Sequence, residues 1–174
     1  MKKYLLLVAL MFFQYFAFCE ISEYKADLNF DGIEDVLIED SEYEYDLEKD
    51  VLRFNIKVII KLLNNDGSLN REIIFNDNRN FNESESDGSL SYYIENNMIV
   101  RDLIIGKHSY KNYINAFFIY DKETDNWKLS KKTIHKSPLH EDKIEDIKYE
   151  TENIYLYDKE NRKILGVLFM STLF

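Results

Sequence analysis

Hydrophobic and polar residues alternate along much of this 174-residue chain, which is the pattern of half-buried β-strands. From Leu52 to Leu62 every second residue is apolar, and the residues between them are mainly Arg, Asn and Lys. Because successive side chains of a strand point to opposite faces, one face of this segment is predicted to lie against a hydrophobic core. Little of the chain shows the spacing of an amphipathic helix.

Turn-forming residues separate the predicted strands at short intervals. The turn at residues 64–67, Asn-Asn-Asp-Gly, has the residue types that tight hairpin turns require, and Arg71–Phe75 is predicted to be the returning strand. Three further hairpins are predicted, namely Leu90–Ile94 with Met98–Ile105, Tyr113–Tyr120 with Trp127–Ile134, and Ile154–Tyr157 with Lys163–Leu173. We therefore expect an all-β fold, an antiparallel meander of hairpins in a single domain. It would be arranged as a sandwich, a partial propeller or a barrel.

Two segments fall outside this strand pattern. Asn76–Ser89 is polar apart from Phe81 and is predicted to be a mobile surface loop. In Leu139–Tyr149, Ile144 and Ile147 stand three residues apart among charged residues, so one or two helical turns are predicted there.

The first 19 residues have the composition of a secretory signal peptide. Two lysines follow the initial Met, and the run from Tyr4 to Phe18 is apolar except for Gln14. This run is shorter than the ~20 apolar residues of a comfortable transmembrane helix. No stable membrane span is therefore expected once the signal is removed.

Small residues at Ala17 and Cys19 predict cleavage before Glu20. We expect residues 1–19 to be the signal peptide and residues 20–174 to form one exported β domain, either periplasmic or secreted. A lipoprotein anchored through Cys19 is the alternative, although the residue before this cysteine is bulkier than a lipidation signal favours.

The charge of the chain excludes some classes of partner. Asp and Glu outnumber Lys and Arg by 32 to 22, and loss of two signal-peptide lysines would change the formal net charge from −10 to −12. Such a surface repels nucleic acid and favours a cationic protein partner. Because Cys19 is the only cysteine, the cleaved chain would have neither a disulfide nor thiol chemistry.

The stretch from Asp27 to Asp35, Asp-Leu-Asn-Phe-Asp-Gly-Ile-Glu-Asp, has the spacing of a calcium-binding loop. Oxygen side chains occupy positions 1, 3, 5 and 9, and the Gly at position 6 allows a sharp turn. The predicted Ca²⁺ ligands are the side chains of Asp27, Asn29, Asp31 and Asp35 and the carbonyl of Ile33. An Asx-rich turn before a strand is the alternative. Repulsion between the three carboxylates of this ligand set, which lie within nine residues, favours the calcium interpretation.

This loop and the apolar run after it resemble the calcium loops of FG-GAP and VCBS-type β-proteins. An EF-hand would place a Glu at position 12, whereas this chain has Ile38 there, so the loop is expected to open into a strand. The resemblance covers residues 24–40, with a weaker likeness from Tyr92 to Leu129. A propeller is not implied, because the loop occurs once.

The resemblance extends to small exported bacterial proteins with a single such loop, some of whose relatives are calcium-binding lysozyme inhibitors. It implies Ca²⁺ as the cofactor and a non-catalytic interaction module as the function. An inhibitor of a basic hydrolase such as lysozyme is one form that this module would take.

A second acidic turn lies between the predicted strands that end at Tyr120 and begin at Trp127. Its Asp121, Glu123 and Asp125 alternate as metal ligands would, but no Gly bends the chain around them. A solvated hairpin tip is therefore expected here.

Residue types that carry catalysis do not form a known motif in this sequence. His108, His135 and His140 are too far apart for a helical metal pair, and neither a Gly-x-Ser-x-Gly sequence nor a Gly-rich phosphate loop occurs. We predict no catalytic and no cofactor-binding residue. Two alternatives stay open: an envelope hydrolase with unidentified acidic residues, and a small outer-membrane β-barrel, whose typical ending Leu168–Phe174 resembles.

Overall fold

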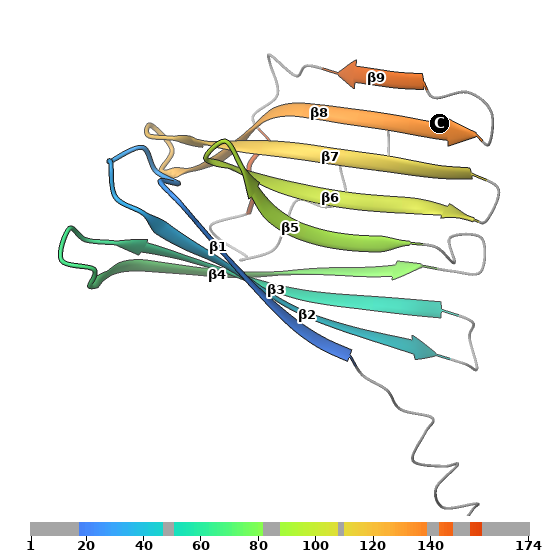
Figure 1. The fold of residues 1–174 in the computed structure, drawn as a ribbon, viewed down its shortest axis with the longest axis horizontal. Coiled ribbons are helices and arrows are strands. Elements are labelled where there is room, and N and C mark those ends of the chain that lie inside the picture. Colours follow the sequence, from blue (N-terminus) through green and yellow to red (C-terminus); the bar gives the residue numbers. More distant parts are fainter. Residues whose placement is uncertain are drawn as a thin grey trace, which may run out of the picture.

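A computed structural model of the chain describes residues 18–46, 51–81, 88–107, 110–138, 143–147 and 154–157. These residues form nine strands and no helix, in two antiparallel sheets (Figure 1). The first sheet contains β1 (Phe18–Ala26), β2 (Asp35–Asp46), β3 (Val51–Leu63) and β4 (Leu69–Phe81). The second contains β5 (Ser89–Glu95), β6 (Met98–Lys107), β7 (Tyr110–Asp121), β8 (Asn126–Pro138) and β9 (Lys143–Ile147). The predicted all-β fold of antiparallel hairpins is confirmed.

Every strand within a sheet pairs with its neighbour in the sequence. The spatial orders are β1-β2-β3-β4 and β5-β6-β7-β8-β9, so hairpins are the only connections within each sheet. The predicted hairpins β3–β4, β5–β6 and β7–β8 are all present. In the described part of the chain, no helix is long and apolar enough to cross a membrane.

The tight turns have the backbone conformations that their residues favour. Asn96 and Asn97, between β5 and β6, have φ of 51° and 59°, as in the two-residue turns that match the twist of a hairpin. Gly67, between β3 and β4, has φ of 78°, and its N–H donates to the carbonyl of Asn64 at 2.8 Å. Asn and Gly tolerate positive φ better than most residues, which explains their place in these turns.

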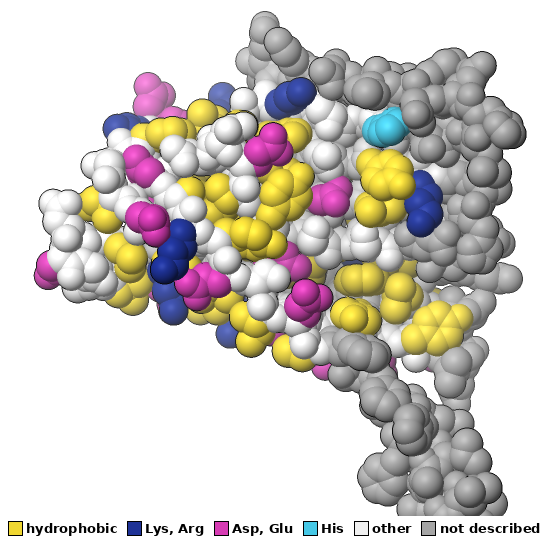
Figure 2. All heavy atoms as spheres, in the orientation of Figure 1, with side chains coloured by type: hydrophobic (Ala, Val, Ile, Leu, Met, Phe, Trp, Pro, Cys, Tyr) yellow, Lys and Arg dark blue, Asp and Glu magenta, His cyan; other side chains and the backbone are white. Residues whose placement is uncertain are grey.

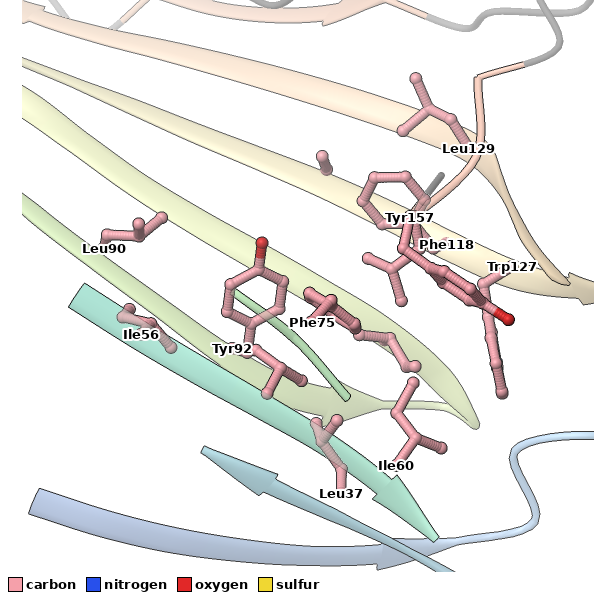
Figure 3. Packing of buried hydrophobic residues seen from close by; sticks show 14 of the residues in the cluster. Leu37, Ile56, Ile60, Phe75, Leu90, Tyr92, Phe118, Trp127, Leu129 and Tyr157 are labelled. Carbon is pink, nitrogen blue, oxygen red and sulfur yellow. The ribbon is translucent and has the colours of Figure 1, made fainter. Parts of the chain in front are cut away.

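The hydrophobic core lies between the inner faces of the two sheets (Figure 3). On β3 the predicted alternation is observed, because Ile56, Val58, Ile60 and Leu62 are buried. The largest side chains of the core come from both sheets and include Phe75 and Phe81 of β4, Tyr92 of β5, Phe118 of β7 and Trp127 of β8. Burial of each large apolar side chain contributes ~1.5–3 kcal/mol to folding.

Residues 154–157 attach to the edge of β8 and reach across to the first sheet. Leu129 N–H donates to the carbonyl of Ile154, and Leu156 N–H donates to the carbonyl of Trp127, each at 2.7 Å. The ring of Tyr157 stacks on Phe75 of β4, with ring centroids 5.9 Å apart. This segment therefore contacts both sheets and helps to hold them together. The strand predicted for residues 163–173 lies outside the described residues.

Two buried carboxylates of the first sheet bind the second sheet. Asp77 Oδ2 accepts hydrogen bonds from Arg101 Nε at 2.6 Å and from Tyr92 Oη at 2.7 Å. Glu39 Oε2 accepts one from the backbone N–H of Tyr92 at 2.5 Å. Because a buried charge without a partner is strongly destabilising, we expect these contacts to hold the sheets in one relative position.

The prediction of a surface loop over Asn76–Ser89 is wrong at both ends. Residues 76–81 continue β4, and Ser89 begins β5. Asn76, Asn78 and Asn80 are exposed on the outer face, whereas Asp77 and Phe81 are buried on the inner face. Asp77, an acidic residue at a core position, interrupts the alternation of apolar and polar residues by which the strand would have been recognised.

The prediction of helical turns within Leu139–Tyr149 is also wrong for the residues that the structure describes. Lys143–Ile147 forms β9 and pairs with residues 132–136 of β8. Backbone pairing with an available edge of the sheet decides the conformation here, because a five-residue segment has little helical stability of its own.

Candidate metal centre

The predicted calcium loop connects the end of β1 to the start of β2, with Ala26 and Asp35 as paired residues at its base. Two residues with positive φ turn the chain inside it, Phe30 at 59° and Gly32 at 88°. Gly adopts this conformation without a steric penalty, as the calcium-loop pattern requires at its sixth position. The loop leads into a strand, as predicted.

Three of the predicted ligand side chains gather around the amides of the loop. Asp27 accepts hydrogen bonds from the N–H groups of Asp31 and Gly32, both at 3.0 Å. Asn29 Oδ1 accepts from the same Asp31 N–H at 3.0 Å, and Asn29 Nδ2 donates to Asp31 Oδ2 at 2.9 Å. Asp31 Oδ1 in turn accepts from the N–H of Ile33 at 2.9 Å. Hydrogen bonds from backbone N–H groups of the loop thus hold the side-chain oxygens of these three residues in place.

Asp35, the fourth predicted side-chain ligand, is fully buried under the loop. Its Oδ2 accepts from the N–H of Leu28 at 3.1 Å, and its Oδ1 accepts from the N–H of Leu63, at the end of β3, at 2.9 Å. Burial raises the pKa of Asp35, the two amides oppose this, and the charges of Asp31 and Asp27 raise it further. Asp35 therefore fastens the loop to the sheet, and each of its oxygens keeps further acceptor capacity.

The structure brings the predicted ligands together only in part. Among the described residues, no three carboxylate, histidine or cysteine side chains are grouped closely enough to hold a metal ion. The predicted set also includes the amide oxygen of Asn29 and the carbonyl of Ile33, which are not of those residue types. All five predicted donors are oxygens, which suits a hard cation such as Ca²⁺.

The carboxylates of the loop have no cationic partner among the residues that the structure describes. In the described part of the chain, no Lys or Arg side chain forms an ion pair with Asp27, Asp31 or Asp35. The surroundings are acidic as well, because residues 18–46, the acidic hairpin β1–β2, contain eleven Asp and Glu and a single Lys. This segment alone has a formal net charge of −10, equal to that of the whole chain. A count of charge along the sequence would have shown this concentration, which the interpretation from motifs missed.

The second acidic turn, residues 121–125, is neutralised differently. Asp125 forms an ion pair with Arg71 of β4 and accepts a hydrogen bond from Tyr120 Oη at 2.6 Å. Asp121 accepts from the N–H of Glu123 at 3.1 Å and from Thr124 Oγ1 at 2.8 Å. These contacts complete a hairpin turn and do not converge on a common centre.

The side chain of Trp127 joins the loop to the second sheet. Trp127 Nε1 donates to the backbone carbonyl of Leu28 at 3.1 Å, and both residues are fully buried. The loop is therefore anchored to β3 through Asp35 and to β8 through Trp127.

The histidines form no cluster in the described part of the chain. The ring of His135 lies beside Tyr113, with centroids 5.7 Å apart, while His108 and His140 lie outside the described residues.

No family model matches this chain, and neither a curated protein nor a solved structure matches it. The likeness of residues 24–40 to FG-GAP and VCBS-type loops stays a prediction from the sequence.

Proposed function

We propose that this chain is an exported, non-catalytic β domain that binds Ca²⁺ in the loop 27–35 and acts as an interaction module for a cationic protein. The observation that supports this best is the uncompensated charge of the loop. Asp27, Asp31 and Asp35, three of the four carboxylates within these nine residues, have amide hydrogen bonds but no Lys or Arg partner in the described part of the chain. A divalent cation would relieve the repulsion between them.

Ca²⁺ takes six to eight oxygen ligands at ~2.3–2.6 Å. The side chains of Asp27, Asn29 and Asp31, the carbonyl of Ile33 and the spare acceptor capacity of Asp35 would supply them, with water completing the shell. Coordination would replace the hydrogen bond between Asn29 and Asp31. The ion would act structurally, by fixing the conformation of the β1–β2 turn.

The acidic hairpin supports a basic protein as the partner. A concentrated negative charge attracts a cationic partner over long range and speeds association, and this attraction weakens as salt rises. Lysozyme is the first partner to test, because it is basic and because the loop resembles that of calcium-binding lysozyme inhibitors.

Export and cleavage before Glu20 belong to the same proposal. Cleavage there would remove Phe18 and Cys19, which pair with Tyr43 and Glu42 at the start of β1, and would leave seven residue pairs from Glu20 to Ala26. The intact mass of the protein purified from its native host should correspond to residues 20–174. A lipid attached to Cys19 would contradict this expectation.

Calcium binding is tested by thermal unfolding in Ca²⁺ and in chelator. At 100 times its dissociation constant, an ion that binds only the folded state stabilises it by ~2.7 kcal/mol. Asp31→Ala should abolish this difference, whereas Asp125→Ala, which removes a carboxylate from the other turn, should leave it intact. Identical melting curves of the unaltered protein in Ca²⁺ and in chelator would refute calcium binding.

The interaction module is tested by titrating lysozyme activity with residues 20–174 in Ca²⁺ at low salt. Inhibition is expected at micromolar protein and should weaken as salt rises. The matched control replaces the exposed residues Glu23, Glu42 and Glu44 by Gln, which lowers the charge of the acidic hairpin and leaves the core unaltered. Absence of inhibition would remove lysozyme as the partner without affecting the calcium test.

A further inference from the structure

The outer face of the second sheet contains a polar stripe between two rows of apolar and aromatic side chains. The stripe runs across β5, β6, β7 and β8 through paired residues and consists of Ser91, Asp102, Asn115 and Thr133. Row one consists of Tyr93, Val100 and Phe117, and row two consists of Ile104, Tyr113 and His135. Figure 2 shows this face over β6 to β8, with hydrophobic side chains in groups and polar or acidic ones between them.

Two oxygen acceptors at the centre of the stripe have no hydrogen-bond donor among the described residues. Asn115 Oδ1 is buried and makes no hydrogen bond to a described residue. Asp102, its cross-strand neighbour, is half-buried and accepts no hydrogen bond in the described part of the chain, and burial raises its pKa against the effect of Arg101. Native proteins pair nearly all such atoms with a protein, water or ligand donor. This pair of acceptors therefore fits a ligand that brings hydrogen-bond donors.

The charges around the stripe lessen its preference for a cation. Lys131 Nζ lies 5.7 Å from the ring centroid of Phe117, and the positive charge of Arg101 acts on Asp102. The hairpin β7–β8, residues 110–138, contains six Lys against three Asp and Glu. These positive charges offset the negative charge of Asp102 and so weaken its preference for an ammonium or guanidinium ligand over a neutral hydroxyl donor.

The flanking rings set the length and shape of the ligand. Phe117 and Tyr113 are four residues apart on β7, which at ~3.4 Å per residue separates them by about 14 Å across the stripe. Both are half-buried, so each ring presents part of its surface to the outside. A ligand that touches both rings and the acceptors between them must combine apolar patches with hydroxyl donors and exceed a single monosaccharide in length.

We propose that the outer face of β5–β8 binds a neutral oligosaccharide. The rings of Phe117 and Tyr113 stack on sugar rings. The part-exposed Asp102 accepts hydrogen bonds from hydroxyl groups between them, as does Asn115 once its buried amide oxygen turns outward. This face is separate from the loop 27–35, so saccharide binding does not depend on the proposed calcium-dependent function.

Calorimetric titration of the purified protein with chitohexaose, cellohexaose and maltohexaose tests the proposal, in Ca²⁺ and in chelator. At least one hexasaccharide should bind, and its monosaccharide should bind at least tenfold more weakly. Phe117→Ala and Tyr113→Ala should each weaken binding at least tenfold, and Asp102→Asn should weaken it severalfold. Tyr45→Ala, which removes an aromatic residue 47% exposed on the first sheet, should leave the affinity unchanged.

Circular dichroism spectra would establish that each variant is folded, and Phe117→Leu replaces Phe117→Ala if the latter does not fold. The proposal is overturned if no hexasaccharide binds at 5 mM, or if the variants of the face bind as tightly as the unaltered protein. It is also overturned if sedimentation shows a dimer that Phe117→Ala dissociates, because the face would then be covered by a second copy of the chain.

Discussion

The acidic hairpin β1–β2 and the hairpin β7–β8 have the same architecture and opposite charge. Each joins two long strands through a turn rich in Asp, and the two turns meet where Trp127 donates to the carbonyl of Leu28. Residues 18–46 have a formal net charge of −10, whereas residues 110–138 have +3.

The two regions also differ in the partners of their turn carboxylates. Asp125 in the second turn is paired with Arg71, whereas Asp27 and Asp31 in the first accept hydrogen bonds from amide groups alone. Alternating carboxylates are therefore insufficient to indicate a metal site. The absence of a cationic partner among the described residues, together with Gly32 at the sharp bend, distinguishes the loop that we propose to bind Ca²⁺.

Removal of the buried side chain of the first turn should have the largest effect on stability. Leu28→Ala deletes a fully buried side chain and should lower the free energy of unfolding by ~2–5 kcal/mol. Phe30→Ala is the matched control, because Phe30 lies in the same loop but is 40% exposed. Urea denaturation measures both. A loss below 1 kcal/mol for Leu28→Ala would mean that the loop is not anchored in the core.

The hydrogen bond between Trp127 and the carbonyl of Leu28 should contribute less to the free energy of unfolding. Trp127→Phe keeps an aromatic ring but leaves the buried carbonyl of Leu28 without its donor, at a cost of ~1–3 kcal/mol. Tyr120→Phe, which removes a hydroxyl bonded to the half-exposed Asp125, should cost less. Denaturation followed by circular dichroism compares the two variants, and equal losses would argue against a special role for the Trp127 contact.

The acidic hairpin should also respond to pH through Glu39. Burial raises the pKa of Glu39 above its ordinary value of 4.5, although the N–H of Tyr92 opposes this. The folded state therefore binds this proton more tightly than the unfolded chain does. Its contribution to stability is complete below pH 4.5 and is lost as pH rises through the raised pKa.

Glu39→Gln keeps an acceptor for the Tyr92 N–H but does not titrate, so its stability should fall less steeply above pH 4.5. Glu42→Gln, an exposed position on the same strand, should retain the slope of the unaltered protein. Urea denaturation at a series of pH values gives the slopes. Parallel curves for Glu39→Gln and the unaltered protein would contradict the prediction.

The ion pair of the second turn should have the smallest effect. Asp125→Asn removes a half-exposed partner of Arg71, so it should cost at most ~1 kcal/mol at low salt and almost nothing at 1 M salt. Denaturation at the two salt concentrations tests this. A larger, salt-independent loss would show that the turn depends on Asp125 for its conformation.

The sequence predicted those strands whose alternation is visible locally. β3 was found because its inner positions are all apolar, and the end of β4 was missed because Asp77 occupies an inner position. The partner that makes this burial tolerable, Arg101, is 24 residues away. A local pattern contains no information about such a partner.

The candidate site was also predictable only as far as its contacts are local in the sequence. Spacing alone placed Asp27, Asn29 and Asp31 together, because the contacts that gather them lie within five residues along the chain. The burial of Asp35 depends on the N–H of Leu63, 28 residues away, and the Trp127 contact spans 99 residues. Both contacts follow from the packing of strands, which spacing does not encode.

The nearest-neighbour order of both sheets has a consequence for the route of folding. No described strand must wait for a distant segment before it finds its partner in the sheet, so closing each hairpin requires only a short loop. Short loops favour fast pairing. A chain that emerges from its N-terminal end could therefore complete β1–β4 before β5–β9 is available. The contacts between Asp77 and Arg101, Glu39 and Tyr92, and Leu28 and Trp127 would then form last, as the step that joins two preformed halves.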